Sequence, residues 1–462
     1  MKVRSRGRLR HRESEDEMKT WTWVIVAGVI AGISAGAWAG EIHQAIAGGN
    51  VEKVRGLLEK DAGLANEADK EEYGETPLQD AVQYGQAEIV KMLLDKGADV
   101  NGRNENRWTA LHYWAREGKP GILKVLIENR ADIEARDDEG RTPLMFAAEK
   151  GTAKEVQALV EAEADVTAMD VMGTTALHLA AWKGDVELMK LLVSKGADVK
   201  GSKKQTWSVL GGAAGEGHLE AVKYLVENGA DVNVRDSFNV SALQWAARHG
   251  RTEVVTYLLE KKADLKGTSR ERQTTLHCAA AGGQMKLAEA AVEAGVDVNA
   301  VAENGTTALY LAAERGDEKM VEFLLGKGAG LEVDTKYGAT LLHAAAKGGL
   351  KGLAERLVAA GEKVNETTNG GETPLHWAVE EEQEEMVTFL AEKGADVNVQ
   401  NRDGETPLHR AVSGGKVKMI RLLLEKGVRT DLKERNGNTP LSLAEMLGGQ
   451  EAAKVLREHG AK

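Results

Sequence analysis

The stretch "TTALHLAAWKGDVELMKLLVSKGADV", residues 174–199, contains the complete pattern that decides the fold. Its hydroxyl residue Thr175 precedes an alanine-rich turn and is expected to cap a first helix by accepting from an orphan backbone N–H. The pair Ala180-Ala181 keeps that helix thin, so that neighbouring units can approach closely. Leu191-Leu192 supply the buried stripe of a second helix, which Gly196 ends in the left-handed conformation that glycine adopts easily. The stretch therefore predicts a pair of helices joined by a short turn.

This unit recurs at a fixed interval of 33 residues, without insertion or deletion. The hydroxyl residue of a T-x-L or S-x-L triplet stands at Thr76, Thr109, Thr142, Thr175, Ser208, Ser241, Thr274, Thr307, Thr340, Thr373, Thr406 and Thr439. Five of the six prolines directly follow such a threonine, at the first helical position, where a missing N–H costs nothing. One helix pair cannot bury its apolar face alone, so the array is interpreted as one stack rather than as several independent domains.

The two ends of the array depart from the strict period and are interpreted as caps. Ile42 stands 36 residues, rather than 33, before its matching leucine, and residues 40–73 are predicted to form an N-terminal capping repeat and loop. Residues 74–436 then hold eleven full repeats. Residues 437–462, with Ser442 and a charged second helix, form the predicted C-terminal capping repeat. The whole array has thirteen units.

Over residues 41–462 the sequence resembles the ankyrin repeat family. The twelve triplets in phase carry the resemblance, and two of them read "TPLH", at residues 373 and 406. The resemblance implies an all-α fold, an α-solenoid of stacked helix-turn-helix repeats with short β-hairpin-like loops. It also implies a non-enzymatic protein-binding module that holds its partner on the concave surface formed by the hairpin tips and the first helices.

The motif residues of such repeats have structural roles in the family. The resemblance assigns these roles, hydrogen bonds that link helix and loop, to Thr76, His112, His178, His277, His343, Thr373, His376, Thr406, His409 and Thr439. His277 is followed by Cys278, which could suggest a catalytic dyad, but adjacent side chains on a helix diverge by about 100°. Cys278 is interpreted as a small apolar filler, and no catalytic residue is predicted.

No metal or cofactor is expected. His343, His376 and His409 lie on consecutive units, too far apart to be ligands about 2 Å from one zinc ion. The sequence contains neither a zinc-protease motif nor a phosphate-binding glycine loop. The acidic run "EEEQEEM", residues 380–386, is interpreted as a solvated surface. Its Glu382 replaces the usual glycine between the two helices, so that this unit is expected to be locally irregular.

The positions that the repeat template leaves free are the candidates for partner binding. By phase, the predicted concave surface holds Tyr73, Tyr84, Trp108, Arg116, Arg141, Met172, Trp182, Lys183, Trp207, Phe238 and Arg248, and later units offer further residues such as Arg270. Tryptophan, tyrosine and arginine dominate the energetic centres of protein interfaces. The alternative is that Trp182 and Trp207 fold onto neighbouring repeats and only pack there.

The N-terminal segment indicates export. Residues 20–39 carry no charge, follow an arginine-rich stretch and end in small residues, which is the pattern of a signal peptide of residues 1–39 cleaved before Gly40. Met18 is a second possible start. Export would place the protein in the periplasm or outside the cell. The alternative is an uncleaved anchor formed by residues 20–39, because about 20 apolar residues can span a bilayer.

Charge and composition bound the remaining function classes. The formal net charge of −12 argues against nucleic-acid binding, which requires a basic surface to neutralise phosphates. One cysteine cannot form an intramolecular disulfide. The protein is expected to be a monomer that binds a protein partner and contacts a membrane only if residues 20–39 are retained. The alternative function is a structural spacer or scaffold at a membrane or cell envelope.

Overall fold

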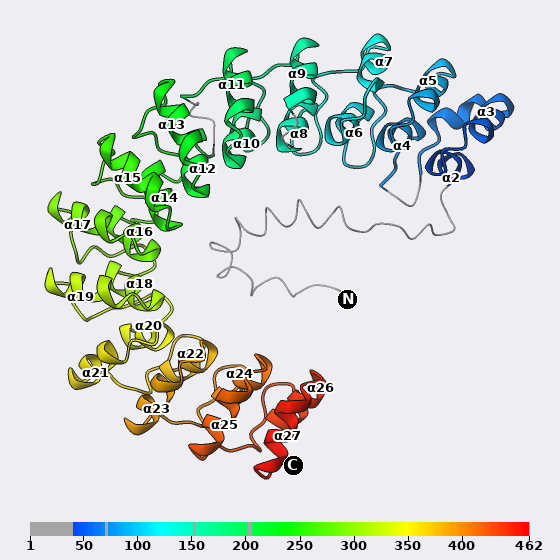
Figure 1. The fold of residues 1–462 in the computed structure, drawn as a ribbon. Helices are drawn as coiled ribbons and strands as arrows, with labels where there is room; N and C mark the ends of the chain where they lie inside the picture. Colours follow the sequence, from blue (N-terminus) through cyan, green and yellow to red (C-terminus); the bar gives the residue numbers. More distant parts are fainter. Residues whose placement is uncertain (1–39, 70–72, 151–152, 201–205, 462) are drawn as a thin grey trace. The chain divides into compact units, whose positions relative to one another are not determined.

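The computed structural model describes residues 40–461 except residues 70–72, 151–152 and 201–205. These residues form helices α2 to α27, arranged as thirteen consecutive pairs (Figure 1). The all-α stack of repeats predicted from the sequence is confirmed. The predicted signal peptide, residues 1–39, lies outside the described residues. Within them, no helix combines the length and apolar composition needed to cross a bilayer.

The chain divides into two compact units, residues 1–131 and residues 132–462. The helices of the first unit are α2 (Glu41–Ala47), α3 (Val51–Lys60), a short 3-10 helix η1 (Ala62–Asn66), α4 (Pro77–Gln83), α5 (Ala87–Asp95), α6 (Ala110–Glu117) and α7 (Ile122–Glu128).

The second unit contains ten helix pairs. The first helices of these pairs are α8 (Pro143–Lys150), α10 (Ala176–Lys183), α12 (Val209–Glu216), α14 (Ala242–Arg248), α16 (Thr275–Gly282), α18 (Ala308–Arg315), α20 (Leu341–Lys347), α22 (Pro374–Glu380), α24 (Pro407–Ser413) and α26 (Pro440–Met446). The second helices are α9 (Ala153–Glu161), α11 (Val186–Ser194), α13 (Leu219–Glu227), α15 (Thr252–Glu260), α17 (Met285–Glu293), α19 (Glu318–Gly326), α21 (Lys351–Ala359), α23 (Glu384–Glu392), α25 (Val417–Glu425) and α27 (Gln450–Glu458).

Small side chains bring neighbouring first helices together. Ala180 and Ala181 of α10 are fully buried, as are Ala213 and Ala214 of α12. First helices of successive pairs therefore pack directly on one another in one row, while the second helices form a second row (Figure 1). Leucines such as Leu192 seal the space between the two rows. Within each unit the core is thus an apolar strip that runs along its helix pairs, as expected for repeats that each bury only one face.

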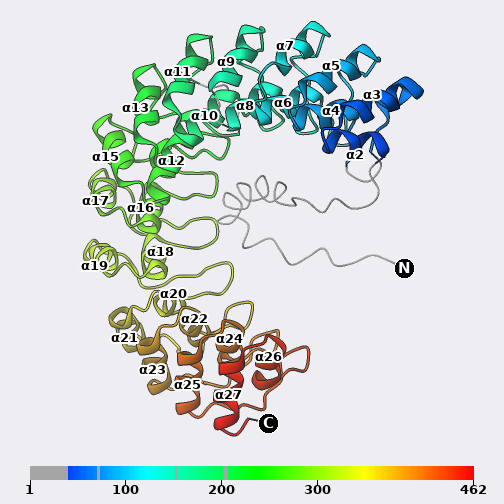
Figure 2. The ribbon, with the colours of Figure 1, turned by 45° about the vertical axis from the view of Figure 1, so that its right-hand side comes forward.

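The loops between pairs project from the row of first helices, on the side away from the second helices (Figure 2). Their tips are joined by single backbone hydrogen bonds. Within the second unit, the N–H of Ser237 donates to the carbonyl of Thr206 (3.1 Å), and the N–H of Arg270 donates to the carbonyl of Phe238 (2.9 Å). Extended pairing in the described loops is limited to two isolated antiparallel bridges, one of them between Thr268 and Thr274. The hairpin tips of the second unit therefore form an edge that is hydrogen-bonded from repeat to repeat.

Two repeats differ from what the sequence predicts. Thr142 is buried, but its hydroxyl has no hydrogen-bond partner among the described residues, in contrast to Ser208, whose hydroxyl accepts from the N–H of Gly211 (2.9 Å). Glu382 was expected to make its unit irregular. Instead it takes the left-handed conformation of the glycine it replaces (φ 57°), so the turn between α22 and α23 is kept.

The first helix pair contains a histidine with an unusual environment. Nε2 of His43 lies 2.7 Å from the carbonyl oxygen of Glu67, and Nδ1 lies 2.6 Å from a carboxylate oxygen of Asp80. A carbonyl oxygen and a carboxylate can only accept, so both ring nitrogens must carry a proton. Burial alone would lower the pKa of His43, but the hydrogen bond and the charge of Asp80 outweigh it and raise the pKa above its usual value.

Candidate functional site

The buried histidines of the repeat motif connect each first helix to the next loop. In His178, His343 and His376, Nδ1 accepts from the backbone N–H of the capping threonine, and Nε2 donates to a carbonyl 29 residues further on (3.1 to 3.2 Å). Burial lowers the pKa of each of these three side chains to about 4. They are therefore neutral and fully hydrogen-bonded.

His277 and Cys278 do not form a catalytic pair. The ring nitrogens of His277 are bonded to Thr274 (2.8 Å) and to the carbonyl of Thr306 (3.2 Å), so neither is directed to the thiol. Cys278 is buried, and burial raises the pKa of its thiol to about 11. Across the described parts of the chain, no three histidine, cysteine, aspartate or glutamate side chains are grouped closely enough to hold a metal ion.

In the first unit, the predicted site residues separate into packed and exposed side chains. Arg116 lies over the rings of Trp108 (5.2 Å to the centroid) and Tyr113 (5.3 Å), so this half-buried group is held together by cation–π contacts. Tyr113 itself is buried and donates to Glu75. Tyr73 and Tyr84, by contrast, are 67% and 50% exposed. Among the described residues of the first unit, these two tyrosines are the large apolar side chains that are exposed.

In the second unit, Arg141 and Trp182 are largely used for packing. Arg141 forms ion pairs with Asp137 (3.0 Å) and Glu139 (2.9 Å) and lies over a phenylalanine ring. Trp182 covers the backbone of α12, where a Cβ added at Gly212 would collide with its indole. This contact supports the packing interpretation of Trp182. Met172 and Lys183, on the same stretch, are exposed.

Three aromatic side chains lie together farther along the second unit. We call Trp207, Phe238 and Trp245 the aromatic cluster. The ring of Trp207 lies 5.3 Å from those of both Phe238 and Trp245, in tilted arrangements. Trp245 is fixed because its indole N–H donates to Asp236 (2.7 Å) and its ring packs beside Gly211. Phe238 is 43% exposed at its hairpin tip, so the cluster combines a fixed base with an accessible edge.

Three arginines lie on α14 and on the hairpin that follows α15, and we call Arg248, Arg270 and Arg272 the arginine group. Arg248 donates to the side chain of Gln273 on that hairpin (3.5 Å). Among the described residues, none of them has a carboxylate within ion-pair distance. Arg270 is placed beside Phe238 by the tip-to-tip hydrogen bond. Glu271, which is exposed, is the acid at the same tip.

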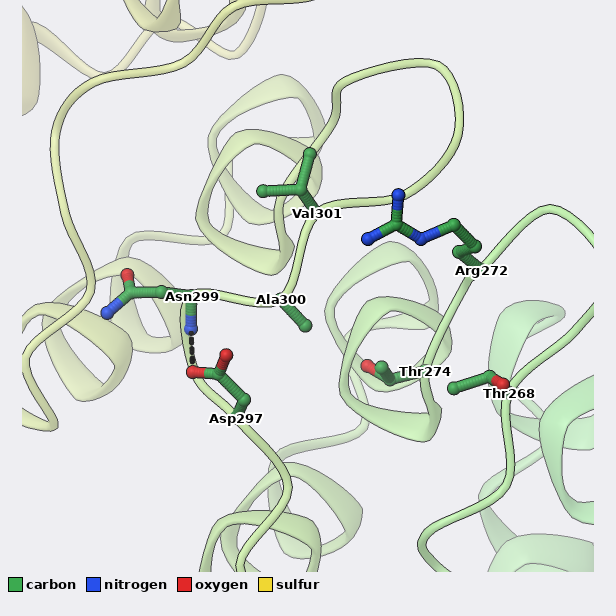
Figure 3. A pocket seen from close by; sticks show the side chains of 7 residues that line it. All are labelled: Thr268, Arg272, Thr274, Asp297, Asn299, Ala300 and Val301. Carbon is green, nitrogen blue, oxygen red and sulfur yellow. Dashed lines mark hydrogen bonds between the residues drawn. The ribbon is translucent and has the colours of Figure 1, made fainter.

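A surface pocket adjoins Arg272. It has a volume of about 390 Å³ and is lined by Thr268, Arg272, Thr274, Asp297, Asn299, Ala300 and Val301. In Figure 3 the guanidinium of Arg272 extends from one hairpin toward Val301 on the next. Asp297 accepts from the N–H of Asn299 (2.9 Å) within its own turn. The pocket thus offers hydrogen-bond donors from the guanidinium of Arg272 and from the hydroxyls of Thr268 and Thr274. Val301 forms an apolar wall.

The positions of residues within the 33-residue period predicted only part of the aromatic cluster and the arginine group. Of the predicted residues, Trp207, Phe238 and Arg248 contribute to the second unit's aromatic cluster and arginine group. Trp245 and Arg272 were missed as partner-binding candidates. Arg272 had a detectable signal, because it occupies the hairpin position that holds glycine in several other units, including Gly173 and Gly305.

The fold and the motif residues define a repeat-built binding scaffold, and comparison with known families gives its class. The profile described as "Ankyrin repeats (3 copies)" matches residues 42–137, 111–203, 199–269 and 243–337, and the profile described as "Ankyrin repeats (many copies)" matches residues 342–391 and 375–424. The chain belongs to the ankyrin repeat family. Its repeats indicate a protein-interaction module, in a family whose members are generally non-catalytic.

Among curated proteins, the chain is similar to a human ion-channel subunit. It is 39% identical over 71 residues to transient receptor potential cation channel subfamily A member 1 of Homo sapiens. The match covers 15% of this chain and 6% of the channel subunit. The similarity is thus confined to a short run of repeats.

Proposed function

We propose that this protein acts without catalysis, as a binding module that holds a protein partner on the hairpin and first-helix side of its second unit. The observation that carries the proposal is the aromatic cluster, in which Phe238 is exposed while Trp245 is fixed from below. Large aromatic side chains bury much area at low entropic cost, and exposed groups of them typically mark binding surfaces. Met172, two units before Phe238, extends the apolar character of the same edge.

Removing the aromatic edge tests this placement. The double variant Trp207→Ala, Phe238→Ala should weaken partner binding by more than about 1 kcal/mol for each side chain. The matched control is Tyr224→Ala, Tyr257→Ala, which removes two half-buried aromatic rings from the second helices α13 and α15. Affinity capture from the protein's own compartment, followed by quantitative mass spectrometry, compares the three proteins. Equal recovery of the partner by wild type and the Trp207, Phe238 double variant would refute the placement.

The cellular location belongs to the same proposal. Export of the chain, to the periplasm or outside the cell, rests on the signal-peptide pattern of residues 1–39. N-terminal sequencing of the natural protein tests it, because cleavage would leave Gly40 as the first residue. A chain that retains residues 20–39 and sediments with membranes would instead support the anchored spacer.

A further inference from the structure

We infer that the partner segment held at this surface is acidic: an extended stretch of protein in which carboxylate side chains flank an apolar one. The apolar side chain packs on the aromatic cluster, and the carboxylates pair with the arginine group. This inference rests on the proposed function and gives its partner a chemical class.

The first support is the charge left uncompensated at the surface. None of Arg248, Arg270 and Arg272 has an ion-pair partner among the described residues. Farther along the same unit the exposed arginines Arg356, Arg421 and Arg435 each pair with a carboxylate of a neighbouring repeat. The chain as a whole is acidic, with a formal charge of −12, but here two arginines without an ion pair lie on one hairpin, and Arg248 reaches Gln273 of the same hairpin (3.5 Å). Such a local gathering of positive charge favours a partner of opposite charge.

The second support is the backbone conformation of Arg272. Its φ is 61°, in the left-handed region that favours glycine; the equivalent position is Asn239 (φ 60°) in the preceding repeat and Gly305 (φ 85°) in the next. An arginine here carries backbone strain that a glycine would avoid. Arg107 of the first unit carries the same strain (φ 59°), so the strain supports a task for Arg272 only together with its position at the pocket. Arg272 also borders the pocket of Figure 3, which is roomy enough to admit an acidic side chain next to the guanidinium.

The third support is the continuity of the binding edge. The tips that carry Thr206, Phe238 and Glu271 are hydrogen-bonded in sequence, and the chain of bonds continues to Glu303 (2.7 Å from the carbonyl of Glu271). With about 9 Å between packed helices, three steps span roughly 27 Å. An extended segment rises about 3.3 Å per residue and would cross this edge with about eight residues. The side chains of one such partner segment can then contact both the aromatic cluster and the arginine group.

An acidic peptide is favoured over a nucleic acid, which could also use arginines and aromatic rings. A nucleic acid carries a phosphate at every nucleotide and requires a broad basic surface. Here the tip itself contains Glu271, and the next tip contains Glu303, which is paired with Lys336 (3.1 Å). Two or three discrete carboxylates fit three arginines better than a continuous polyanion does.

Selection of peptides tests the inference. Random displayed peptides of about 12 residues, longer than the crossing, are panned on the full chain, and selected sequences are synthesised for binding measurements. We expect aspartate and glutamate to be enriched at least about twofold over the input library. The triple variant Arg248→Gln, Arg270→Gln, Arg272→Gly should bind the selected peptides about tenfold more weakly. Binding by the wild type should weaken several-fold between about 50 and 300 mM NaCl, because salt screens exposed charges.

The chain offers a matched control. Arg107→Gly in the first unit makes the same substitution at the same left-handed hairpin position (φ 59°), in a repeat that contributes no residue to the proposed surface. It should leave peptide binding within about twofold of the wild type, whereas Arg272→Gly alone should weaken it about threefold. Because both changes relieve the same backbone strain, a misfolded hairpin cannot account for a difference between them.

The outcomes separate this inference from the proposed function. Peptides that need Trp207 and Phe238 but show no acidic enrichment would overturn the inference and leave the proposed function intact. Peptides that bind equally well without these two aromatic side chains, or a failure to enrich any peptide, would count against both. A labelled single-stranded oligothymidine that binds the wild type more tightly than the selected peptides, with loss in the arginine triple variant, would overturn the acidic-peptide assignment.

Discussion

Two regions of the second unit use the same repeat template differently. In residues 206–274, which contain the aromatic cluster, the arginine group has no carboxylate partners. In residues 340–437, Arg410 alone forms ion pairs with Glu372, Glu380 (3.2 Å) and Glu405 (2.9 Å), which come from three different segments. The comparison indicates that Arg410 links neighbouring repeats in the later region, as Arg235 does in the earlier one by pairing with Asp264 (3.1 Å), whereas the arginine group has no carboxylate partner among the described residues and remains available to a partner.

The regions also differ in the residue that links first helix and loop. Residues 340–437 carry histidine at this position in three consecutive units, His343, His376 and His409. In residues 206–274 the same position holds Gly211 and Gln244. The Gln244 amide reproduces the histidine contacts, accepting from the N–H of Ser241 (3.0 Å) and donating to the carbonyl of Gly267 (3.0 Å), but it has no titratable group.

The largest expected effect that sharpens this comparison is an acid sensitivity of stability that is stronger in residues 340–413 than in residues 206–260. His343 and His376 have a folded pKa of about 4 against about 6.5 unfolded, so between these values the unfolded state binds more protons and stability falls as pH falls. At pH 5 the loss is about 2 kcal/mol for each histidine. Hydrogen exchange at pH 5 and pH 7, corrected for intrinsic rates, should show more opening of residues 340–413 than of residues 206–260, where burial also lowers the pKa of His249.

The variant His376→Gln copies Gln244 and serves as the control. It should reduce the loss of stability at pH 5 by the contribution of one histidine, and it should leave the fold intact at neutral pH. Equal acid sensitivity in the two regions, or in this variant and the wild type, would contradict the proposed origin of the effect.

An intermediate effect is expected from removing one arginine in each region. Arg410→Met leaves three carboxylates close together without their cation and should lower the free energy of unfolding by about 1–3 kcal/mol. Arg248→Met, with no ion pair to lose among the described residues, should change it by less than about 0.5 kcal/mol. Urea unfolding monitored by circular dichroism measures both. The comparison would fail if the Arg248 variant were the more destabilised of the two.

The smallest effect concerns the strained hairpin positions. Arg272→Gly and Arg107→Gly should each leave stability unchanged or raise it by up to about 1 kcal/mol, because the left-handed backbone is disfavoured for a side chain and natural for glycine. Thermal unfolding of both variants checks this. Marked destabilisation by Arg272→Gly would mean that its side chain supports the hairpin rather than a partner.

The repeat period predicted the helix pairs and their order, because each T-x-L triplet fixes a cap and a helix start locally. It did not predict which side chains remain available to contact a binding partner. Trp182 packs because Gly212, thirty residues later, leaves room for its indole. Arg410 is paired because Glu372, Glu380 and Glu405 converge on it from separate segments. Such contacts depend on which side chains face one another across neighbouring units, and the period alone carries no information on that.

His43, which is protonated on both ring nitrogens, gives the first helix pair a pH dependence of stability opposite to that of the buried motif histidines. Its pKa is raised by Asp80, so the stabilisation is fully present below the unfolded value of about 6.5 and is lost as pH rises through the folded pKa. The stabilisation by His43 is therefore already complete in the acidic range where the buried histidine links farther along weaken. Mild alkali should loosen the packing of α2 on α4, and mild acid the packing of the later repeats.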